Sequence, residues 1–285
     1  MNVVLLADEG ALFQSLCARL DERQRRYQVR PYQNILATPP PVASIVVDTR
    51  SRFLIHTGQE NNYPFADFSR LVALCKQQGH AYFLSSDAMV FDGAEGKRFQ
   101  EGDEPKPASV VGQALSAREK FLQAELPKHL ILRLGLLFSE SGHHGVLSLM
   151  ERFRQAKTLA LNHFELHCPT HVRDAARVIA AVLDQLCCDA PNWGAFHYCS
   201  TDPVTDYEFA EVILAAASQY WDLSTIELQR SDIFTPRQPM LHCQKIRDAY
   251  GVQQKPWRAF VSSTLKNLFE SGDVKWSKMV RSSDS

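Results

Sequence analysis

Two adjacent serines and an aspartate lie at the predicted end of a strand, where their polar side chains could bind or react with a ligand. Ser85, Ser86 and Asp87 directly follow the apolar run from Gly79 to Leu84, which is typical of a buried parallel strand. In an open α/β sheet the carboxyl ends of the strands line the ligand crevice, so these side chains are expected to face a ligand. A serine hydroxyl there could hydrogen-bond a substrate carbonyl, although by itself it is a poor proton donor.

A second group of candidate residues lies between positions 163 and 171. Imidazole and thiolate are zinc ligands, and the spacing of His163, His167, Cys168 and His171 suggests a metal site. Pro169 interrupts any helix that would align the histidines, and no paired Cys-x-x-Cys motif strengthens the signal. We therefore predict no metal site.

Composition limits the partners of the chain. It has 285 residues, 45% of them hydrophobic, and a formal net charge of -1, so it carries no electrostatic footprint for nucleic acid or an anionic membrane. No apolar stretch approaches the roughly 18 residues of a membrane span, and the seven scattered cysteines suit reduced thiols. We expect a soluble cytoplasmic protein that binds neither nucleic acid nor a membrane.

The hydrophobic pattern predicts strands that alternate with helices, as in an α/β protein with a doubly wound parallel sheet. Strands are expected at 2–6, 27–32, 44–48, 130–138 and 196–199, and helices at 11–20, 65–78, 146–155, 172–187 and from 205 to about 220. Thr170 is expected to cap the helix that begins at Val172. Thr205 and Glu208 have the spacing of a capping box.

The stretch from Ser85 to Gly93 resembles the Ser-Thr-Asp-Tyr-Val-Phe-Asp-Gly signature of the dTDP-4-dehydrorhamnose reductase family, a sugar-nucleotide-binding branch of the extended short-chain dehydrogenase/reductases. The similarity continues in family order through 99–107, 130–138, 168–176, 194–198 and 235–239. It implies a Rossmann-like nucleotide-binding domain at 1–165 and a small C-terminal α/β substrate lid formed mainly by 166–274, with segments that return to the sheet. A flexible tail is expected at 275–285.

The resemblance also locates a cofactor site. The family carries a Gly-x-x-Gly-x-x-Gly turn after the first strand, and of its three glycines only Gly10 remains here, because Ala7 and Phe13 replace the others. Asp8 and Glu9 add negative charge beside a helix N-terminus that would otherwise attract phosphate. The cofactor-binding positions implied are Gly10, Leu12, Arg30 and Ser85. We expect that no cofactor is required, while NAD(P) binding stays open.

The catalytic residues of the family are altered as well. Its members place a Tyr-x-x-x-Lys pair on the next helix, and the alignment puts Val111 and Leu115 at those two positions. Neither side chain can transfer a proton, so Ser86 is the one catalytic position that keeps its chemistry. The expected substrate-binding positions are Asp87, Arg133, Thr170, Arg173 and Arg237. The resemblance places Arg237 at a family arginine of the substrate lid, Arg133 and Arg173 are further candidates, and the three guanidinium groups around one predicted crevice suit an anion.

Two hypotheses follow. The first is a catalytically degenerate family member that acts as a binding or regulatory protein, with a nucleotide-sugar-like ligand, a protein partner or a second copy as its target. The regulatory subunit of methionine adenosyltransferase is similar to the same family and docks to an enzyme. The second is an NAD(P)H-dependent reductase of a nucleotide-sugar-like substrate. It would use Gly10, Arg30 and Ser86, together with a replacement acid such as Asp87 or His56.

Overall fold

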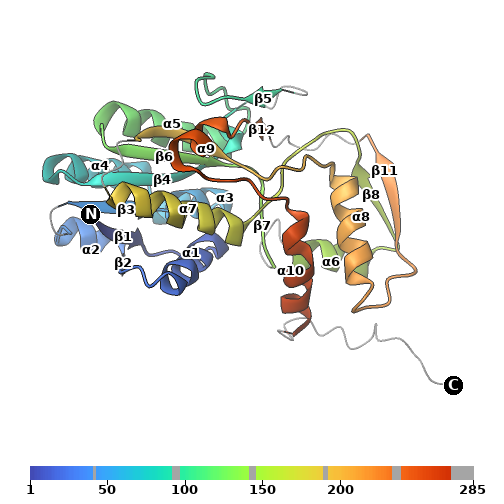
Figure 1. The fold of residues 1–285 in the computed structure, drawn as a ribbon. Coiled ribbons are helices and arrows are strands. Elements are labelled where there is room, and N and C mark those ends of the chain that lie inside the picture. The colour runs from blue at the N-terminus through green and yellow to red at the C-terminus, as the bar shows by residue number, and fades with distance from the viewer. Residues whose placement is uncertain (41–42, 92–96, 141–145, 189–191, 233–238, 271–285) are drawn as a thin grey trace.

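The central layer of the protein is a six-stranded parallel sheet with helices on both faces (Figure 1). The structure is a computed structural model and describes residues 1–40, 43–91, 97–140, 146–188, 192–232 and 239–270. From edge to edge the strands are β10 (Gly194–Tyr198), β6 (His129–Leu134), β4 (Ala81–Asp87), β3 (Ser44–Asp48), β1 (Asn2–Leu6) and β2 (Tyr27–Arg30). The order reverses between β1 and β3, and doubly wound folds bind ligands at such a switch point.

Both faces of this sheet are covered because its strands are apolar on both sides. Val3 and Leu5 of β1 belong to one core cluster, and Val4 and Leu6 belong to another. One face packs against α1 (Ala11–Glu22) and α7 (Val172–Cys187), and the other against α4 (Phe65–Gln78) and α5 (Val110–Glu125). Near-continuous hydrophobic strands of this kind are typical of parallel sheets.

A smaller α/β layer stands beside the C-terminal ends of the strands (Figure 1). Its elements are α6 (Val146–Gln155), β8 (Thr158–Asn162), α8 (Asp206–Ala217), β11 (Glu227–Ser231) and α10 (Arg258–Glu270). Strands β8 and β11 pair in parallel, and Trp257 is fully buried within their common core. The boundary that we placed at residue 165 stays a prediction.

The remaining elements are short. They are α2 (Tyr32–Ala37), α3 (Arg50–His56), η1 (Glu60–Asn62), η2 (Ala88–Val90), β5 (Arg98–Phe99), β7 (Leu137–Phe138), β9 (Thr170–His171), β12 (Met240–Leu241) and α9 (Gln244–Tyr250). Strand β5 pairs with β12 and β7 pairs with β9. Within the described ranges, no helix combines the length and the hydropathy that crossing a membrane requires.

The predicted fold class is confirmed, and three local predictions need correction. The strand expected at 130–138 is two strands, because β6 ends at Leu134 and a side chain at Gly135 would come within 2.8 Å of the Cys168 carbonyl oxygen. The strand from Tyr27 ends at Arg30, and α2 follows. The cap of α7 is His171, whose Nδ1 accepts from the Arg173 amide, whereas the Thr170 hydroxyl donates to the Cys168 carbonyl.

Candidate functional site

The turn between β1 and α1 carries an internal carboxylate at the helix N-terminus. Gly10 is the N-cap of α1, and its amide donates to Asp8 Oδ1 at 2.9 Å. The Thr49 hydroxyl, at the end of β3, donates to Asp8 Oδ2 at 3.1 Å. The ring of Phe53 lies against Gly10 so closely that a Cβ there would be 2.9 Å from it. The two strands at the switch point are therefore joined through side chains of the chain itself.

Burial changes the acidity of this carboxyl group. The desolvation of Asp8 raises its pKa above the ordinary value of 3.8, and the hydrogen bonds from Gly10 and Thr49 oppose that shift only in part. The nearby Arg50 guanidinium donates to the Ala7 carbonyl oxygen at 2.8 Å rather than to the Asp8 carboxylate. The ionised form of Asp8 is thus less favourable here than in water.

The other predicted cofactor positions lie apart from this turn or inside the core. Arg30 donates to the carbonyl oxygens of Asn34 and Thr38, at 2.9 and 2.7 Å, and so caps α2. Leu12 is buried in the core cluster between α1 and the sheet. Ser85 is fully buried, and its hydroxyl has no hydrogen-bond partner among the described residues. The cofactor roles of these residues stay predictions.

Ser86 belongs to a buried ion-pair network that spans three elements. Its hydroxyl donates to the Glu119 carboxylate on α5. Arg133 on β6 forms a two-pronged ion pair with the same carboxylate, with Nη2 and Nε 2.7 and 3.0 Å from Oε2. The guanidinium also lies over the Phe91 ring, 5.0 Å from its centroid. Charge-assisted, bidentate bonds of this kind are strong, so the network fixes the Ser86 hydroxyl.

The network ends at His197 on the edge strand β10. Arginine has no acceptor, so Arg133 Nη1 donates to His197 Nε2 at 3.2 Å, and the ring must carry its proton on Nδ1, which donates to the Phe99 carbonyl at 3.2 Å. Burial, together with the neighbouring Arg133 charge, lowers the pKa of His197 to about 3. His197 is therefore a neutral structural partner at physiological pH.

The positions of the family's tyrosine and lysine are apolar and packed. Leu115 is fully buried and Val111 half-buried, and both contact the main core cluster. Between them, a Cβ on Gly112 would be 2.0 Å from the Met89 carbonyl oxygen, so α5 lies directly against η2. The Ser109 hydroxyl caps α5 by accepting from the Gly112 amide at 3.0 Å. Neither Val111 nor Leu115 carries a group that can transfer a proton.

Asp87 forms a separate cluster with α3. Its Oδ2 accepts from Arg52 Nη2 at 2.6 Å and lies 3.1 Å from His56 Nε2, while Oδ1 accepts from the Met89 amide at 2.9 Å. Burial raises the pKa of Asp87, but the Arg52 charge and the hydrogen bonds outweigh burial, and the net shift is downward. The structure thus brings together the two residues that we named as candidates for a replacement acid.

The remaining predicted substrate positions occupy different places. Thr170 is fully buried, and its hydroxyl oxygen accepts from the Ser200 amide at 3.1 Å. Arg173, at the start of α7, forms an ion pair with Glu140. Arg237 lies outside the described residues. Their substrate roles stay predictions.

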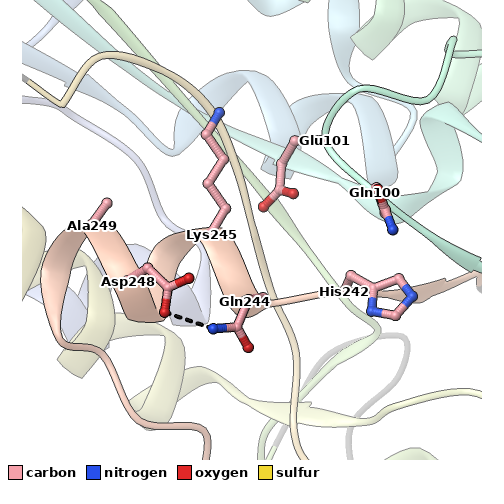
Figure 2. A pocket seen from close by; sticks show the side chains of 7 residues that line it. All are labelled: Gln100, Glu101, His242, Gln244, Lys245, Asp248 and Ala249. Carbon is pink, nitrogen blue, oxygen red and sulfur yellow. Dashed lines mark hydrogen bonds between the residues drawn. The ribbon is translucent and has the colours of Figure 1, made fainter.

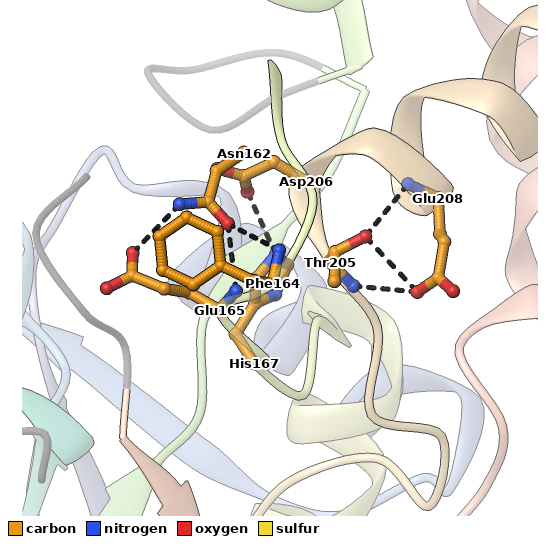
Figure 3. A network of polar contacts seen from close by, with 7 residues as sticks. All are labelled: Asn162, Phe164, Glu165, His167, Thr205, Asp206 and Glu208. Carbon is orange, nitrogen blue, oxygen red and sulfur yellow. Dashed lines mark hydrogen bonds and ion pairs between the residues drawn. The ribbon is translucent and has the colours of Figure 1, made fainter. Parts of the chain in front are cut away.

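The histidines of the loop 162–171 have protein partners. His167 Nε2 lies 2.9 Å from Asp206 Oδ1, beside the capping box of Thr205 and Glu208 (Figure 3). The side chain of Asn162 accepts from the amides of Phe164 and Glu165, at 3.0 and 2.8 Å, and so shapes the loop. The stretches that the structure describes contain no group of three His, Cys, Asp or Glu side chains that could hold a metal ion.

Sequence reasoning missed Glu119 and Phe53. Glu119 follows Leu115 by four residues on a helix, and residues spaced in this way share a face, so its approach to the Ser86 strand could have been predicted. Phe53 reaches Gly10 through the packing of α3 against β4 and α5, and no spacing in the sequence indicates that contact.

A parallel sheet of this order, with helices on both faces and a switch point between β1 and β3, defines a Rossmann-like α/β protein. Similar solved structures include a dTDP-4-dehydrorhamnose reductase from Clostridium acetobutylicum, at 19% identity, a TM-score of 0.77 and coverage of 94% of this chain and 99% of that one. Another is the dTDP-4-dehydrorhamnose reductase from Bacillus anthracis in complex with NADP, at 15% identity and a TM-score of 0.74, covering 93% and 99% of the two chains.

The sequence matches the family described as the RmlD substrate binding domain over residues 59–270, and the chain belongs to that family. Curated relatives include a dTDP-4-dehydrorhamnose reductase from Aggregatibacter actinomycetemcomitans, 26% identical over 188 residues. The methionine adenosyltransferase 2 subunit beta from Danio rerio is 29% identical over 217 residues. The matched stretches cover 63% and 73% of this chain, and only 63% and 66% of the lengths of these relatives.

Proposed function

We propose that this chain is a non-catalytic member of its family that works in the cytoplasm as a binding or regulatory protein. The observation that carries the proposal is the state of Ser86, whose hydroxyl is engaged by Glu119 while aliphatic side chains stand at the tyrosine and lysine positions. Reduction of a carbonyl requires a proton for the developing alkoxide, and neither Val111 nor Leu115 has one to give. Loss of acid–base catalysis alone typically costs about 10²–10⁴-fold in rate.

The first turn supports the same proposal, because it does not fit a pyrophosphate. A dinucleotide needs the amides at the N-terminus of α1 and close access to the backbone at Gly10. Here the Gly10 amide donates to the Asp8 carboxylate, and the Phe53 ring covers Gly10. A phosphate at this position would meet a buried carboxylate and an aromatic ring.

The relatives favour a protein as the target. Among them is the methionine adenosyltransferase 2 subunit beta, whose name describes a subunit of an enzyme. We infer that the chain acts by docking to a partner enzyme, and a methionine adenosyltransferase is the first candidate to test. A nucleotide-sugar-like ligand would be a second target, held between the sheet and the smaller α/β layer.

Titration of the pure protein with NADH and NADPH tests the loss of the reductase activity. A ligand that binds the folded state raises its thermal stability, so the proposal expects no saturable shift in melting temperature with either dinucleotide. A reductase from the same family serves as the positive control. A saturable shift, together with oxidation of NADPH in the presence of a dTDP-4-keto sugar, would refute the proposal.

A second test restores the tyrosine and the lysine of the family at positions 111 and 115. Val111 is half-buried and should accept a tyrosine, whereas a lysine at position 115 would be fully buried, and Glu119 on the same helix face is already paired with Arg133. Burying an unpaired charge is strongly unfavourable, so Leu115→Lys should lower the melting temperature sharply while Val111→Tyr changes it little. Turnover of NADPH by the folded double variant would show that the rest of the crevice is intact.

Retained reductase activity with an unusual acid is a second candidate, and the His56–Asp87 pair favours it. A histidine oriented by a carboxylate is a common proton-transfer group, and the partner of this one, Asp87, directly follows Ser86 at the end of β4. If this candidate is right, His56→Gln abolishes NADPH oxidation at an unchanged melting temperature. If the first proposal is right, the wild-type protein itself does not oxidise NADPH.

A further inference from the structure

Three buried cysteines from distant parts of the chain lie together beside the C-terminal end of β10. Cys199 directly follows β10, Cys243 lies between β12 and α9, and Cys168 precedes β9. All three are free thiols, with exposures of 1%, 6% and 3% in that order. The Sγ atoms of Cys199 and Cys243 are 3.7 Å apart, although 44 positions separate the two residues in the sequence. The fold therefore brings together two thiols that no sequence motif connects.

The surrounding backbone directs these two thiols toward each other. Both lie near the same carbonyl oxygen, that of Leu241, at 3.6 Å from Cys199 Sγ and 3.9 Å from Cys243 Sγ. On the other side, a Cβ on Gly135 would be 2.8 Å from the Cβ of Cys199, and Gln254 donates to the Cys199 carbonyl at 2.8 Å. The packing around Cys199 thus holds its sulfur against that of Cys243.

The distance between the two sulfur atoms is short enough for a covalent bond to form. A disulfide bond is about 2.05 Å long, so sulfurs that start 3.7 Å apart must approach by about 1.7 Å. Modest rotations about the two Cα–Cβ bonds can supply this approach. A disulfide between these residues consequently requires no rearrangement of the sheet.

The two thiols differ in their access to solvent. Cys243 is the more exposed, and its neighbours His242 and Gln244 line an open cavity of about 600 Å³. Figure 2 shows their side chains on the wall of this cavity. The hydrogen bond with Cys168 lowers the pKa of Cys199, but the contact with Cys243 and burial raise it by more. A small oxidant therefore meets Cys243 first.

We propose that Cys199 and Cys243 form a reversible disulfide when the protein meets hydrogen peroxide. The deprotonated sulfur of Cys243 attacks one peroxide oxygen, the O–O bond breaks, and a sulfenic acid and one water result. The sulfur of Cys199 then attacks the sulfenic sulfur. The S–S bond forms, the S–O bond breaks, and the hydroxyl leaves with the Cys199 proton as a second water. The two sulfurs together lose two electrons to the peroxide, and a dithiol reductant restores both thiols by exchange.

The bond would connect the end of β10 to the start of α9. These elements are already in contact, since Lys245 on α9 caps β10 by donating to the Ala195 carbonyl at 2.7 Å. Because α9 contributes four of the residues that line the cavity, oxidation would fix this wall to the sheet. Disulfides in cytosolic proteins are usually transient and redox-sensing. The pair thus adds a modification site to the proposed binding role and does not depend on that role.

The test oxidises the folded, full-length protein with a small excess of hydrogen peroxide. Catalase then removes the peroxide, and N-ethylmaleimide in denaturant blocks every remaining thiol. A protease that cleaves before aspartate separates Cys199 from Cys188, because Asp189 lies between them. Mass spectrometry of the unreduced digest should show the peptides of Cys199 and Cys243 joined, and dithiothreitol should part them. The oxidised protein should also melt about 5–10 °C higher than the reduced one.

Single variants identify the partners of the bond. Cys199→Ala and Cys243→Ala should each abolish the linked peptides and the rise in melting temperature. Cys75→Ala is the matched control, because Cys75 is equally buried, with a pKa that burial raises to about 12, and should leave the linkage unchanged. Cys168→Ala should leave it unchanged as well, since the third thiol takes no part in the bond.

Three results would overturn the inference. One is recovery of both cysteines as maleimide adducts after the folded wild-type protein has been oxidised. Another is a bond from Cys199 to Cys168 in place of Cys243, and the third is a bond that appears only once the protein is unfolded. These readouts use the wild-type chain, so they stand even if a variant fails to fold. They are also independent of NADPH binding, which tests the proposed function.

Discussion

The hydroxyl of Ser86, at the end of β4, donates a hydrogen bond to the carboxylate of Glu119 on α5. Glu119 lies one helical turn beyond Leu115, which stands at the family's lysine position. Glu119 also pairs with Arg133, so the Ser86 hydroxyl is bound to the carboxylate of a buried ion pair. The network holds the Ser86 hydroxyl in a fixed position between two charged side chains.

Glu119→Gln should therefore be strongly destabilising. Both partners of the pair are almost completely buried, with side-chain exposures of 2% for Arg133 and 1% for Glu119. Removing one charge leaves the other uncompensated, which typically costs about 3–5 kcal/mol. The loss should appear in the free energy of unfolding measured with urea at neutral pH.

Ser86→Ala serves as the matched control for that prediction. It removes one hydrogen bond but leaves the bidentate Arg133–Glu119 pair intact, so it should cost only about 1 kcal/mol. If Ser86→Ala proved as damaging as Glu119→Gln, the serine would have a role that the ion pair does not explain. The same result would weaken the proposal that Ser86 is structural.

Asp8→Asn should stabilise the protein at neutral pH. Burial raises the pKa of Asp8 in the folded state, so the favourable contribution of this group is present below its unfolded value and is lost as the pH rises through the folded value. At pH 7 the buried carboxylate is a cost, and asparagine keeps an acceptor for the Gly10 amide. Urea unfolding across pH should show an advantage of the variant that vanishes in acid.

The same substitution at Asp87 should have the opposite effect. Burial raises the pKa of Asp87, but Arg52 and the hydrogen bonds lower it further, so its stabilising contribution is present above the unfolded value and is lost as the pH falls through the folded one. Asp87→Asn leaves the largely buried Arg52 without its counter-ion, at a cost of about 3–5 kcal/mol at neutral pH. A loss of equal size at acidic pH would contradict this assignment.

The elements of the sheet could be predicted from sequence because their signals are local. Apolar runs mark β1 and β3, and the bounds of α4 and α7 agree with the periodicity of their buried residues. Gly135 shows where such signals fail. The run from Leu130 to Phe138 is apolar apart from Arg133 and Gly135, and the division into two strands at Gly135 lies where the backbone closely approaches Cys168 and Cys199.

The candidate site was less predictable, because its contacts join distant parts of the chain. The positions of Ser86, Val111 and Leu115 follow from the resemblance, and four-residue spacing could have added Glu119. The contact of Phe53 with Gly10 and the capping of β10 by Lys245 depend on how α3 and α9 pack, and neither short helix was predicted. Sequence patterns locate elements more readily than contacts between them.

Reopening the first turn should restore some affinity for a dinucleotide. Asp8→Gly removes the carboxylate from the N-terminus of α1, and Phe53→Ala removes the ring that covers Gly10. The freed amides can then donate hydrogen bonds to a phosphate, so the double variant should show a saturable rise in melting temperature with NADPH that the wild type lacks. Phe53→Ala alone should lower the melting temperature without gaining binding, because Asp8 remains. A folded double variant without any shift would mean that another part of the crevice excludes the dinucleotide.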